Sequence, residues 1–277
     1  MQATTAEGFE LRGSVTPIRE LLSEIWEKRR LIRLLARRDF HVRYRRPTFG
    51  LVWVIMVPLI QTTVLSIIFT RIVRFTTPGI SFPVFMLSGI TPWLFFSSTV
   101  SGSVTAITGG GNLATKVYFP RAILPLVGVR SNLYGFGHRL AIVLLAALIF
   151  RQGIGPEVVL LLPALALMVL LASAFALVFS AMQVYFRDTS FIVSAVMQAW
   201  FWGSAVFYPI TRAGEGLLRT AMTVNPATGM VYLFRSAIVG WPIEWALIVS
   251  TLAWSAGLLV FSLFLYRRYN RVFTDLL

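Results

Sequence analysis

Side chains that could carry chemistry are scarce in this sequence of 277 residues. It contains no Cys and two His, His41 and His138, so disulfides, thiolate chemistry and Cys-based metal sites are excluded, and a histidine-rich metal site is not expected. The Gly-x-x-x-x-Gly-Lys-Ser/Thr phosphate loop and the His-Glu-x-x-His zinc helix are both missing. We therefore expect no catalytic residue, no metal site and no cofactor bound by this chain.

The acidic residues also argue against one class of transporter. Glu157, Glu215, Glu244 and Asp188 lie near the ends of the apolar stretches, and none lies in the middle of one. Proton-coupled carriers often keep carboxylates at that depth. Their absence from the middle of the apolar stretches makes an ion-coupled carrier a weaker hypothesis.

The basic residues Arg130, His138 and Arg139 are unusual because they fall inside an apolar stretch, residues 124–150. Arginine at this depth is costly and normally faces protein or water. Arg139 follows Arg130 by nine residues, about 13 Å along a helix. We expect Arg139 to face a polar cavity, a partner subunit or an anionic ligand; the alternative is a shifted span or a kink at nearby glycines.

The elements that must position these side chains are membrane-spanning helices. Hydrophobic residues make up 57% of the chain and charged residues 13%, with a mean hydropathy of +0.76. A spanning helix needs roughly 20 apolar residues, and only helices satisfy their own backbone in lipid without closing a barrel. The sequence predicts an all-α integral membrane protein, a single domain over 1–277 with a cytoplasmic region 1–48, a six-span region 49–266 and a tail 267–277. The predicted spans are roughly 49–70, 82–105, 124–150, 158–186, 191–210 and 245–266.

The net charge of +14 is interpreted as loop charge rather than as a nucleic-acid surface. Seventeen Lys and Arg residues fall in the two termini and two alternate loops, against six in the remaining loops. Cytoplasmic loops carry the excess of positive charge, so both termini are predicted to be cytoplasmic. The polar first 46 residues do not resemble a signal peptide.

Residues 16–33 predict a helix lying in the membrane interface. Thr16 and Pro17 suit a helix start, and basic residues gather toward the end. The alternative is an ordinary basic segment flanking the first span. The apolar stripe consists of Ile18, Leu21, Leu22, Ile25 and Trp26.

Three further segments are more than plain loops. Residues 112–125 predict a short amphipathic helix that docks into a cytoplasmic partner, or a simple connecting turn with snorkelling basic residues. Residues 208–240 are too polar to span and too apolar for a free loop, as in re-entrant hairpins. The aromatic cluster at 199–208 suits either an interfacial belt or the lining of a transport path.

Several ordered stretches together resemble the membrane subunit of ABC-2 type exporters, in the branch that exports lipid-linked polysaccharides such as O-antigen, capsule and teichoic acid. The match covers nearly the whole chain. It is carried by Leu34–Arg46, Phe49–Trp53, Pro58, Lys116–Arg121, Leu124–Pro125, Tyr185–Asp188, Phe207–Pro209, Asn225–Pro226 and Arg235. The basic run Arg130 to Arg139 departs from the mostly apolar stretch of that family, which raises the hypothesis of a strongly anionic polymer as cargo.

The resemblance implies a homodimer in the bacterial cytoplasmic (inner) membrane, joined by two copies of a separate ABC ATPase that binds ATP and Mg. It implies an interface or gate helix bearing Leu22, Ile25, Trp26, Arg29 and Arg30. It implies ATPase coupling through Lys116, Tyr118, Phe119, Pro120 and Arg121, with a second contact at Arg187 and Asp188, and two short re-entrant helices closing the outer side. The conduit candidates for the lipid-linked glycan are Trp93, Phe95, Phe96, Phe201, Trp202, Phe207 and Tyr208, together with Arg139.

Three alternatives remain beside an exporter of lipid-linked glycans. An ABC-2 exporter of a small molecule or lipid would keep the fold and change the cargo. A membrane-embedded enzyme would need acids or histidines converging at one depth. An ion-coupled secondary transporter would work without an ATPase subunit.

Overall fold

The computed structural model describes residues 18–45, 48–75, 77, 79–109, 120–153 and 155–269. These residues form helices and connecting segments, with no strand among them. The elements in chain order are α1 (Ile18–Glu27), α2 (Arg29–Arg45), α3 (Val52–Ile67), the π-helical η1 (Ile68–Ile72), α4 (Phe82–Val104), α5 (Ala106–Gly109), α7 (Ile123–Ile149), η2 (Pro156–Leu160), α8 (Leu161–Tyr185), α9 (Thr189–Gly203), η3 (Ile210–Ala213), α10 (Leu217–Val224), α11 (Pro226–Val239) and α12 (Trp245–Tyr269).

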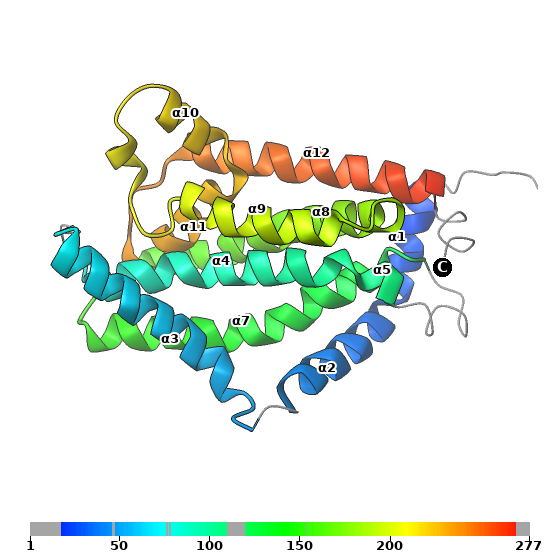
Figure 1. Cartoon of the computed structure of the whole chain (residues 1–277), viewed down its shortest axis with the longest axis horizontal. Helices are drawn as coiled ribbons and strands as arrows, with labels where there is room; N and C mark the ends of the chain where they lie inside the picture. Colours follow the sequence, from blue (N-terminus) through cyan, green and yellow to red (C-terminus); the bar gives the residue numbers. More distant parts are fainter. Residues whose placement is uncertain are drawn as a thin grey trace, which may run out of the picture.

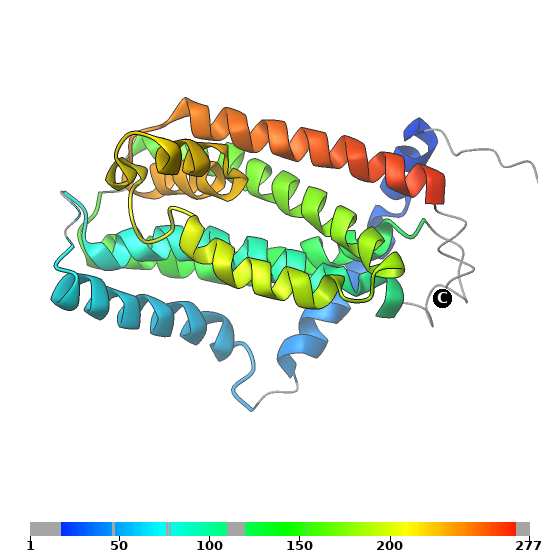
Figure 2. The same cartoon turned by 45° about the horizontal axis from the view of Figure 1, so that its top comes forward.

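Five of these helical segments in the described part of the chain are long and apolar enough to cross a membrane. They lie side by side along the long axis of the molecule (Figures 1 and 2). This confirms the all-α membrane fold, and the bounds agree with prediction within a few residues. The five segments are Val52–Ile72, Phe82–Val104, Ile123–Ile149, Pro156–Tyr185 and Trp245–Arg267.

The fifth predicted span, residues 191–210, is not found as one helix. Helix α9 has 15 residues, about 22 Å, which is shorter than a hydrocarbon core of roughly 30 Å. After Gly203 the chain leaves the helix and stays irregular to Pro209. Proline has no backbone N–H, and the carbonyls of Ala205 and Val206 bond to a side chain rather than to the next turn.

Helix α4 forms the centre of the bundle. In the most apolar 18-residue stretch of α4, 78% of the residues are buried. The corresponding share is 22% in the first span and 28% in α12. It packs against α3, α7, α8, α9 and α11. The outer surfaces of α3 and α12 stay apolar and exposed, as expected for surfaces that meet lipid or another subunit.

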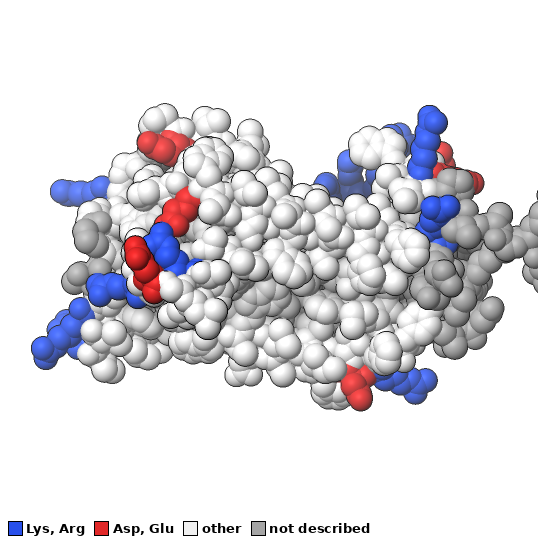
Figure 3. All heavy atoms as spheres, turned by 90° about the horizontal axis from the view of Figure 1, so that it is seen from above, with Lys and Arg blue, Asp and Glu red and all other residues white. Residues whose placement is uncertain are grey.

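Charged side chains are confined to the two ends of the molecule on the face seen in Figure 3, with a broad uncharged band between them. One end carries α1 and the last turn of α12, and the opposite end carries α10 (Figure 1). We call these the α1 end and the α10 end. The uncharged band is the pattern of a multi-pass membrane protein.

The predicted interface helix 16–33 differs from the structure. The described part breaks at Lys28 into α1 and α2, and α2 runs on to Arg45. Leu21 of α1 is buried against the end of α12, whereas Ala36 and Phe40 of α2 are buried toward α7. One straight helix cannot reach both surfaces, so the chain turns between them.

Candidate functional site

A small apolar cluster closes the α1 end of the bundle. Leu21 is 1% exposed and lies in a cluster with Ile107 of α5, Ala122 just before α7, Leu177 of α8 and Tyr266 of α12. The Tyr266 hydroxyl also lies 2.9 Å from Ser180 Oγ, which ties α12 to α8. The first and last described helices are thereby anchored at the same end.

The interface-helix residues divide between two faces of α1 and α2. Ile25 is partly buried beside Leu21, whereas Leu22 is 49% exposed and Trp26 69% exposed. Arg29 folds back over Trp26, with its guanidinium carbon 5.1 Å from the ring and Nη1 donating to the Trp26 carbonyl at 3.0 Å. Arg30 is exposed as well. The apolar stripe therefore packs inward on one edge and presents an aromatic–cation pair on the other.

The predicted coupling segment is described only in part. Lys116, Tyr118 and Phe119 lie outside the described residues. Pro120 and Arg121 lie before α7 and are both buried, Arg121 with 7% exposure and no hydrogen-bond partner for Nη1 among the described residues. Burial lowers the pKa of Arg121 from its ordinary value. Arg121 thus lies inside the α1 end rather than on its surface.

Arg187 and Asp188 are exposed in the turn between α8 and α9. Gln183 holds this turn from both sides: its Nε2 donates to the Arg187 carbonyl at 2.9 Å, and its Oε1 accepts from the Ser190 N–H at 2.9 Å. Gln183 was not among the predicted site residues. The sequence signal for it was a lone amide near the end of an otherwise apolar helix.

The predicted conduit aromatics on α4 belong to the core of the chain. Trp93 is 4% exposed, and Phe95 and Phe96 are fully buried. Phe95 packs on Phe136 of α7 and Phe96 on Phe175 of α8, with ring centroids 5.7 and 5.5 Å apart. Their placement does not support a role in lining a conduit on the surface of this chain.

The conduit aromatics in the last turn of α9 and just after it are more accessible. Trp202 is 53% exposed, Phe201 and Tyr208 are partly exposed, and Phe207 is buried between them. The Phe207 ring lies 4.9 Å from both Trp202 and Tyr208, and the Tyr208 hydroxyl donates to the Trp202 carbonyl at 2.7 Å. The irregular stretch after α9 therefore folds into a compact aromatic cluster.

Two polar side chains, one at the N-cap of α11 and one in the middle of the helix, hold this irregular stretch. Asn225 accepts from Trp200 Nε1 at 2.8 Å and donates to the Gly203 carbonyl at 3.0 Å. The Tyr232 hydroxyl accepts from the Ile210 N–H. The Gly203 carbonyl and the Ile210 N–H are backbone groups that the interrupted helix leaves without intrahelical partners.

Arg235 supplies the central contact between α11 and the stretch after α9. It is 0% exposed, and its guanidinium donates to Ser88 Oγ at 3.3 Å, to the Ala205 carbonyl at 3.1 Å and to the Val206 carbonyl. The guanidinium carbon lies 3.8 Å from the Phe85 ring centroid. Each of the three guanidinium nitrogens of this buried arginine thus makes a hydrogen bond, and the charge lies over an aromatic ring, without a carboxylate. Sequence reasoning quoted Arg235 for the resemblance but did not foresee this role.

The basic run on α7 packs against α2. Arg43 Nη1 donates to Asn132 Oδ1 at 3.0 Å, and the Phe40 ring stacks on His138 with centroids 6.1 Å apart. Arg139 is 8% exposed and lies beside Tyr44. Helix α7 is continuous from Ile123 to Ile149, so the structure has neither a break at the nearby glycines nor a shifted span.

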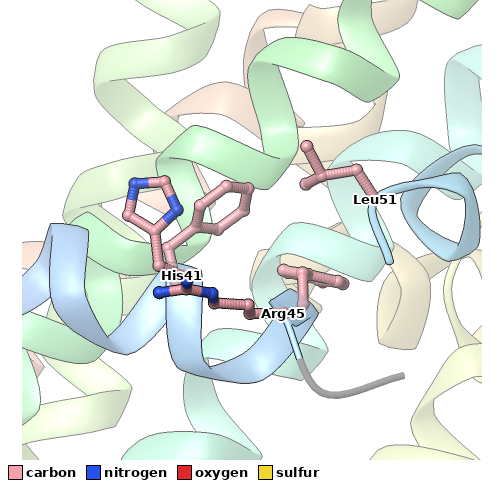
Figure 4. Close-up of a pocket in the computed structure, with 5 residues that line it drawn as sticks. His41, Arg45 and Leu51 are labelled. Atoms are coloured by element: carbon pink, nitrogen blue, oxygen red, sulfur yellow. The ribbon is translucent and has the colours of Figure 1, made fainter. Parts of the chain in front are cut away.

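A hollow of about 430 Å³ opens at the elbow between α2 and α3. It is lined by Phe40, His41, Tyr44, Arg45 and Leu51. Figure 4 shows His41 and Arg45 on α2, with Leu51 across the hollow at the start of α3. Tyr44 connects the hollow to Arg139, because its side chain contacts both.

Comparison with known proteins identifies the family. Residues 30–239 match the model of the ABC-2 type transporter family. The chain is 30% identical to the O-antigen export system permease protein RfbA of Myxococcus xanthus over 78% of this chain and 83% of that protein. It is 26% identical to the RfbA of Klebsiella pneumoniae (74% and 78% covered) and 25% identical to the polysialic acid transport protein KpsM of Escherichia coli (75% and 81% covered). The chain therefore belongs to the ABC-2 type transporter family.

Proposed function

We propose that this chain is the membrane permease subunit of an ATP-driven ABC exporter that moves a lipid-linked polysaccharide, of the O-antigen, capsule or teichoic acid type, from the cytoplasm to the outside. The observation that carries the proposal is the match over residues 30–239, together with relatives named for O-antigen export and polysialic acid transport. The multi-pass helical bundle agrees with such a subunit.

The working assembly in this proposal is a homodimer with two copies of a separate ABC ATPase in the bacterial inner membrane. ATP and Mg bind to the ATPase, which hydrolyses ATP, while this chain provides the path. The α1 end is cytoplasmic, which places both termini in the cytoplasm. The basic residues of α2 support this orientation, because cytoplasmic segments carry the excess of Lys and Arg.

Coupling to the ATPase is assigned to two segments of the α1 end. The first is Lys116–Arg121, which is anchored in the bundle by the buried residues Pro120 and Arg121. The second is the turn with Arg187 and Asp188, which Gln183 holds in an exposed position. A conformational change of the ATPase that moves either segment would also move α7 or α8, because the two segments adjoin the ends of those helices.

The path for the glycan is assigned to the aromatic cluster at the end of α9 and just after it, at Phe201, Trp202, Phe207 and Tyr208. Sugar rings stack on aromatic faces, and Trp202 offers an accessible one. The outer closure is assigned to α10 and α11, which follow this cluster in the chain and lie toward the α10 end. The gate toward the cytoplasm is assigned to α1 and α2, with the exposed pair Trp26 and Arg29.

The test is copurification with the ABC ATPase encoded next to this chain, followed by ATP turnover in lipid nanodiscs. The variant is Phe119→Ala with Arg121→Ala; the control is Arg212→Ala, an exposed residue near the α10 end. We expect a stable complex in which only the Phe119/Arg121 variant loses assembly or turnover. A well-folded chain with no ATPase partner would overturn the proposal. Cells lacking the chain should accumulate lipid-linked glycan on the cytoplasmic face of the inner membrane; export of a small molecule instead would change the cargo and keep the exporter.

A further inference from the structure

Among the described residues, Arg139 and Arg235 are buried in membrane-embedded helices, and their surroundings differ. Burying a guanidinium is costly unless its donors find acceptors. Arg235 meets this requirement with one hydroxyl and two carbonyls. Arg139 is 8% exposed, and its Nε and Nη1 have no hydrogen-bond partner in the described part of the chain. Two guanidinium nitrogens of Arg139 thus have no partner among the described residues, whereas each guanidinium nitrogen of Arg235 makes a hydrogen bond.

The charges around Arg139 increase this imbalance. The cation Arg43 lies close enough to repel it. The acid that α2 offers nearby, Asp39, is already paired with Arg43 at 3.2 Å. No carboxylate lies within ion-pair distance of Arg139 among the residues that the structure describes. The site thus carries an excess of positive charge that an anionic group would neutralise.

The side chain of Arg139 runs back along its own helix. Its Nη2 lies 3.8 Å from the position that a Cβ on Gly135 would occupy, and the Phe40 ring lies 3.7 Å from the same position. Gly135 precedes Arg139 by one turn, so the guanidinium is directed toward the start of α7 and toward α2. A long basic side chain directed this way brings its charge nearer to the membrane surface.

An entrance to this site exists at the elbow hollow described above. Its rim carries the exposed side chains His41 and Arg45, and Tyr44 separates the hollow from Arg139. A volume of about 430 Å³ accommodates a phosphate or diphosphate group. Rotation of the Tyr44 ring would join the hollow to the unpaired donors of Arg139.

We propose that the pocket formed by α2, the start of α3 and α7 binds the phosphate group of an anionic lipid, with Arg139 as the buried donor and Arg45 at the rim. Guanidinium groups suit phosphate because their planar donors match its oxygens, and basic pockets between membrane helices bind anionic headgroups. The phosphate belongs either to a membrane phospholipid or to the carrier of a lipid-linked glycan; the second source rests on the proposed function.

The test is binding of two probes by the purified full-length chain in phosphatidylcholine nanodiscs. One probe is fluorescent phosphatidylglycerol and the other is a short-chain polyprenyl diphosphate without sugar. We expect Arg139→Gln to weaken the binding of one probe at least tenfold and Arg45→Gln to weaken the binding of the same probe several-fold. The matched control is Arg130→Gln, an exposed arginine on the same helix, which should bind as the wild type does.

The two probes separate the sources of the phosphate. If Arg139→Gln binds only polyprenyl diphosphate more weakly, the site belongs to the glycan carrier. If it binds only phosphatidylglycerol more weakly, the site belongs to a structural lipid. Unchanged binding of both by folded Arg139→Gln overturns the proposal; if that variant does not fold, unchanged binding by Arg45→Gln overturns it. ATPase copurification tests the proposed function independently, so loss of the phosphate site leaves the exporter assignment in place.

Discussion

The Arg235 guanidinium donates a 3.1 Å hydrogen bond to the carbonyl of Ala205, thirty residues earlier in the chain. This contact lets the chain leave the α9 helix inside the bundle without abandoning the carbonyls that the helix would have bonded. The aromatic cluster of Phe201, Trp202, Phe207 and Tyr208 is built on the stretch that Arg235 holds. The shape of the proposed path thus depends on a residue that lies outside it.

Replacing Arg235 should show this dependence. We expect Arg235→Met to destabilise the protein by roughly 2–4 kcal/mol, because two buried carbonyls lose hydrogen bonds to a charged donor. The measurement is the thermal unfolding midpoint in detergent. Arg212→Met is the control, because this exposed arginine stacks on Phe75 near the α10 end and bonds no buried carbonyl in the described structure. Equal midpoints for the two variants would contradict the role of Arg235.

Gly89 of α4 should tolerate no side chain. A Cβ there would meet the Val206 carbonyl and would lie 2.6 Å from Arg235 Nη2. We expect Gly89→Ala to lower the unfolding midpoint markedly, by the overpacking cost of about 1–3 kcal/mol. Gly102→Ala on the same helix is the matched control, since a Cβ there meets nothing within 4 Å. A midpoint as high as that of Gly102→Ala would show that the stretch after α9 is looser than described.

Gly229 lies where α11 closely approaches α12. An added Cβ would collide with the Leu247 carbonyl and with Thr251 Oγ1, which already donates to the Pro226 carbonyl at 2.8 Å. Small residues allow membrane helices to approach in this way. We expect Gly229→Ala to reduce the yield of folded protein on size-exclusion chromatography. Gly257→Ala, where α12 is open, should behave like the wild type.

Substitution of two adjacent leucines of α1, Leu21 and Leu22, should change the stability of the protein by very different amounts. We expect Leu21→Ala to cost about 2–5 kcal/mol of stability, because it empties a buried site in the cluster with Tyr266. Leu22→Ala removes a side chain that is 49% exposed and should change stability little. If α1 acts as a gate, Leu22→Ala should still lower glycan export in cells. A stable variant with full export would remove Leu22 from the gate surface.

Gln183 should matter for coupling more than for folding. Gln183→Leu loses two hydrogen bonds that hold the turn of Arg187 and Asp188, each worth about 1 kcal/mol. We expect the assembled complex to keep its composition and to lose several-fold in ATP turnover in nanodiscs. Gln198→Leu, an exposed amide on α9, is the control. Turnover unchanged in both variants would exclude the turn from the coupling path.

Some features of this molecule follow from short stretches of sequence. The span predicted at 82–105 is α4, Phe82–Val104, and the span predicted at 245–266 agrees with α12. Such elements are readable because twenty apolar residues have one stable arrangement in lipid, and each residue contributes independently of its neighbours in space. The family resemblance likewise depends on ordered local stretches, and the match over residues 30–239 confirmed it.

Other features depend on residues far apart in the chain. Phe95, Phe96 and Trp202 are equally aromatic in sequence, yet the first two fill the core and the third is exposed. The break of the predicted interface helix at Lys28 and the early end of α9 also follow from contacts with other helices. Propensity alone does not register these contacts, because tertiary packing overrides it.

The sequence by itself thus determined that the chain lies in a lipid bilayer, that it is helical, where most of its spans run and to which family it belongs. These properties depend on hydrophobicity and local motifs, which are properties of contiguous residues. Only the tertiary structure decided which of its polar residues are satisfied. Arg139 and Arg235 read alike as arginines in apolar stretches, but packing surrounds one with carbonyls and leaves two donors of the other unpaired. The free energy of a buried charge depends on the acceptors within hydrogen-bonding distance, and folding alone brings those acceptors into place.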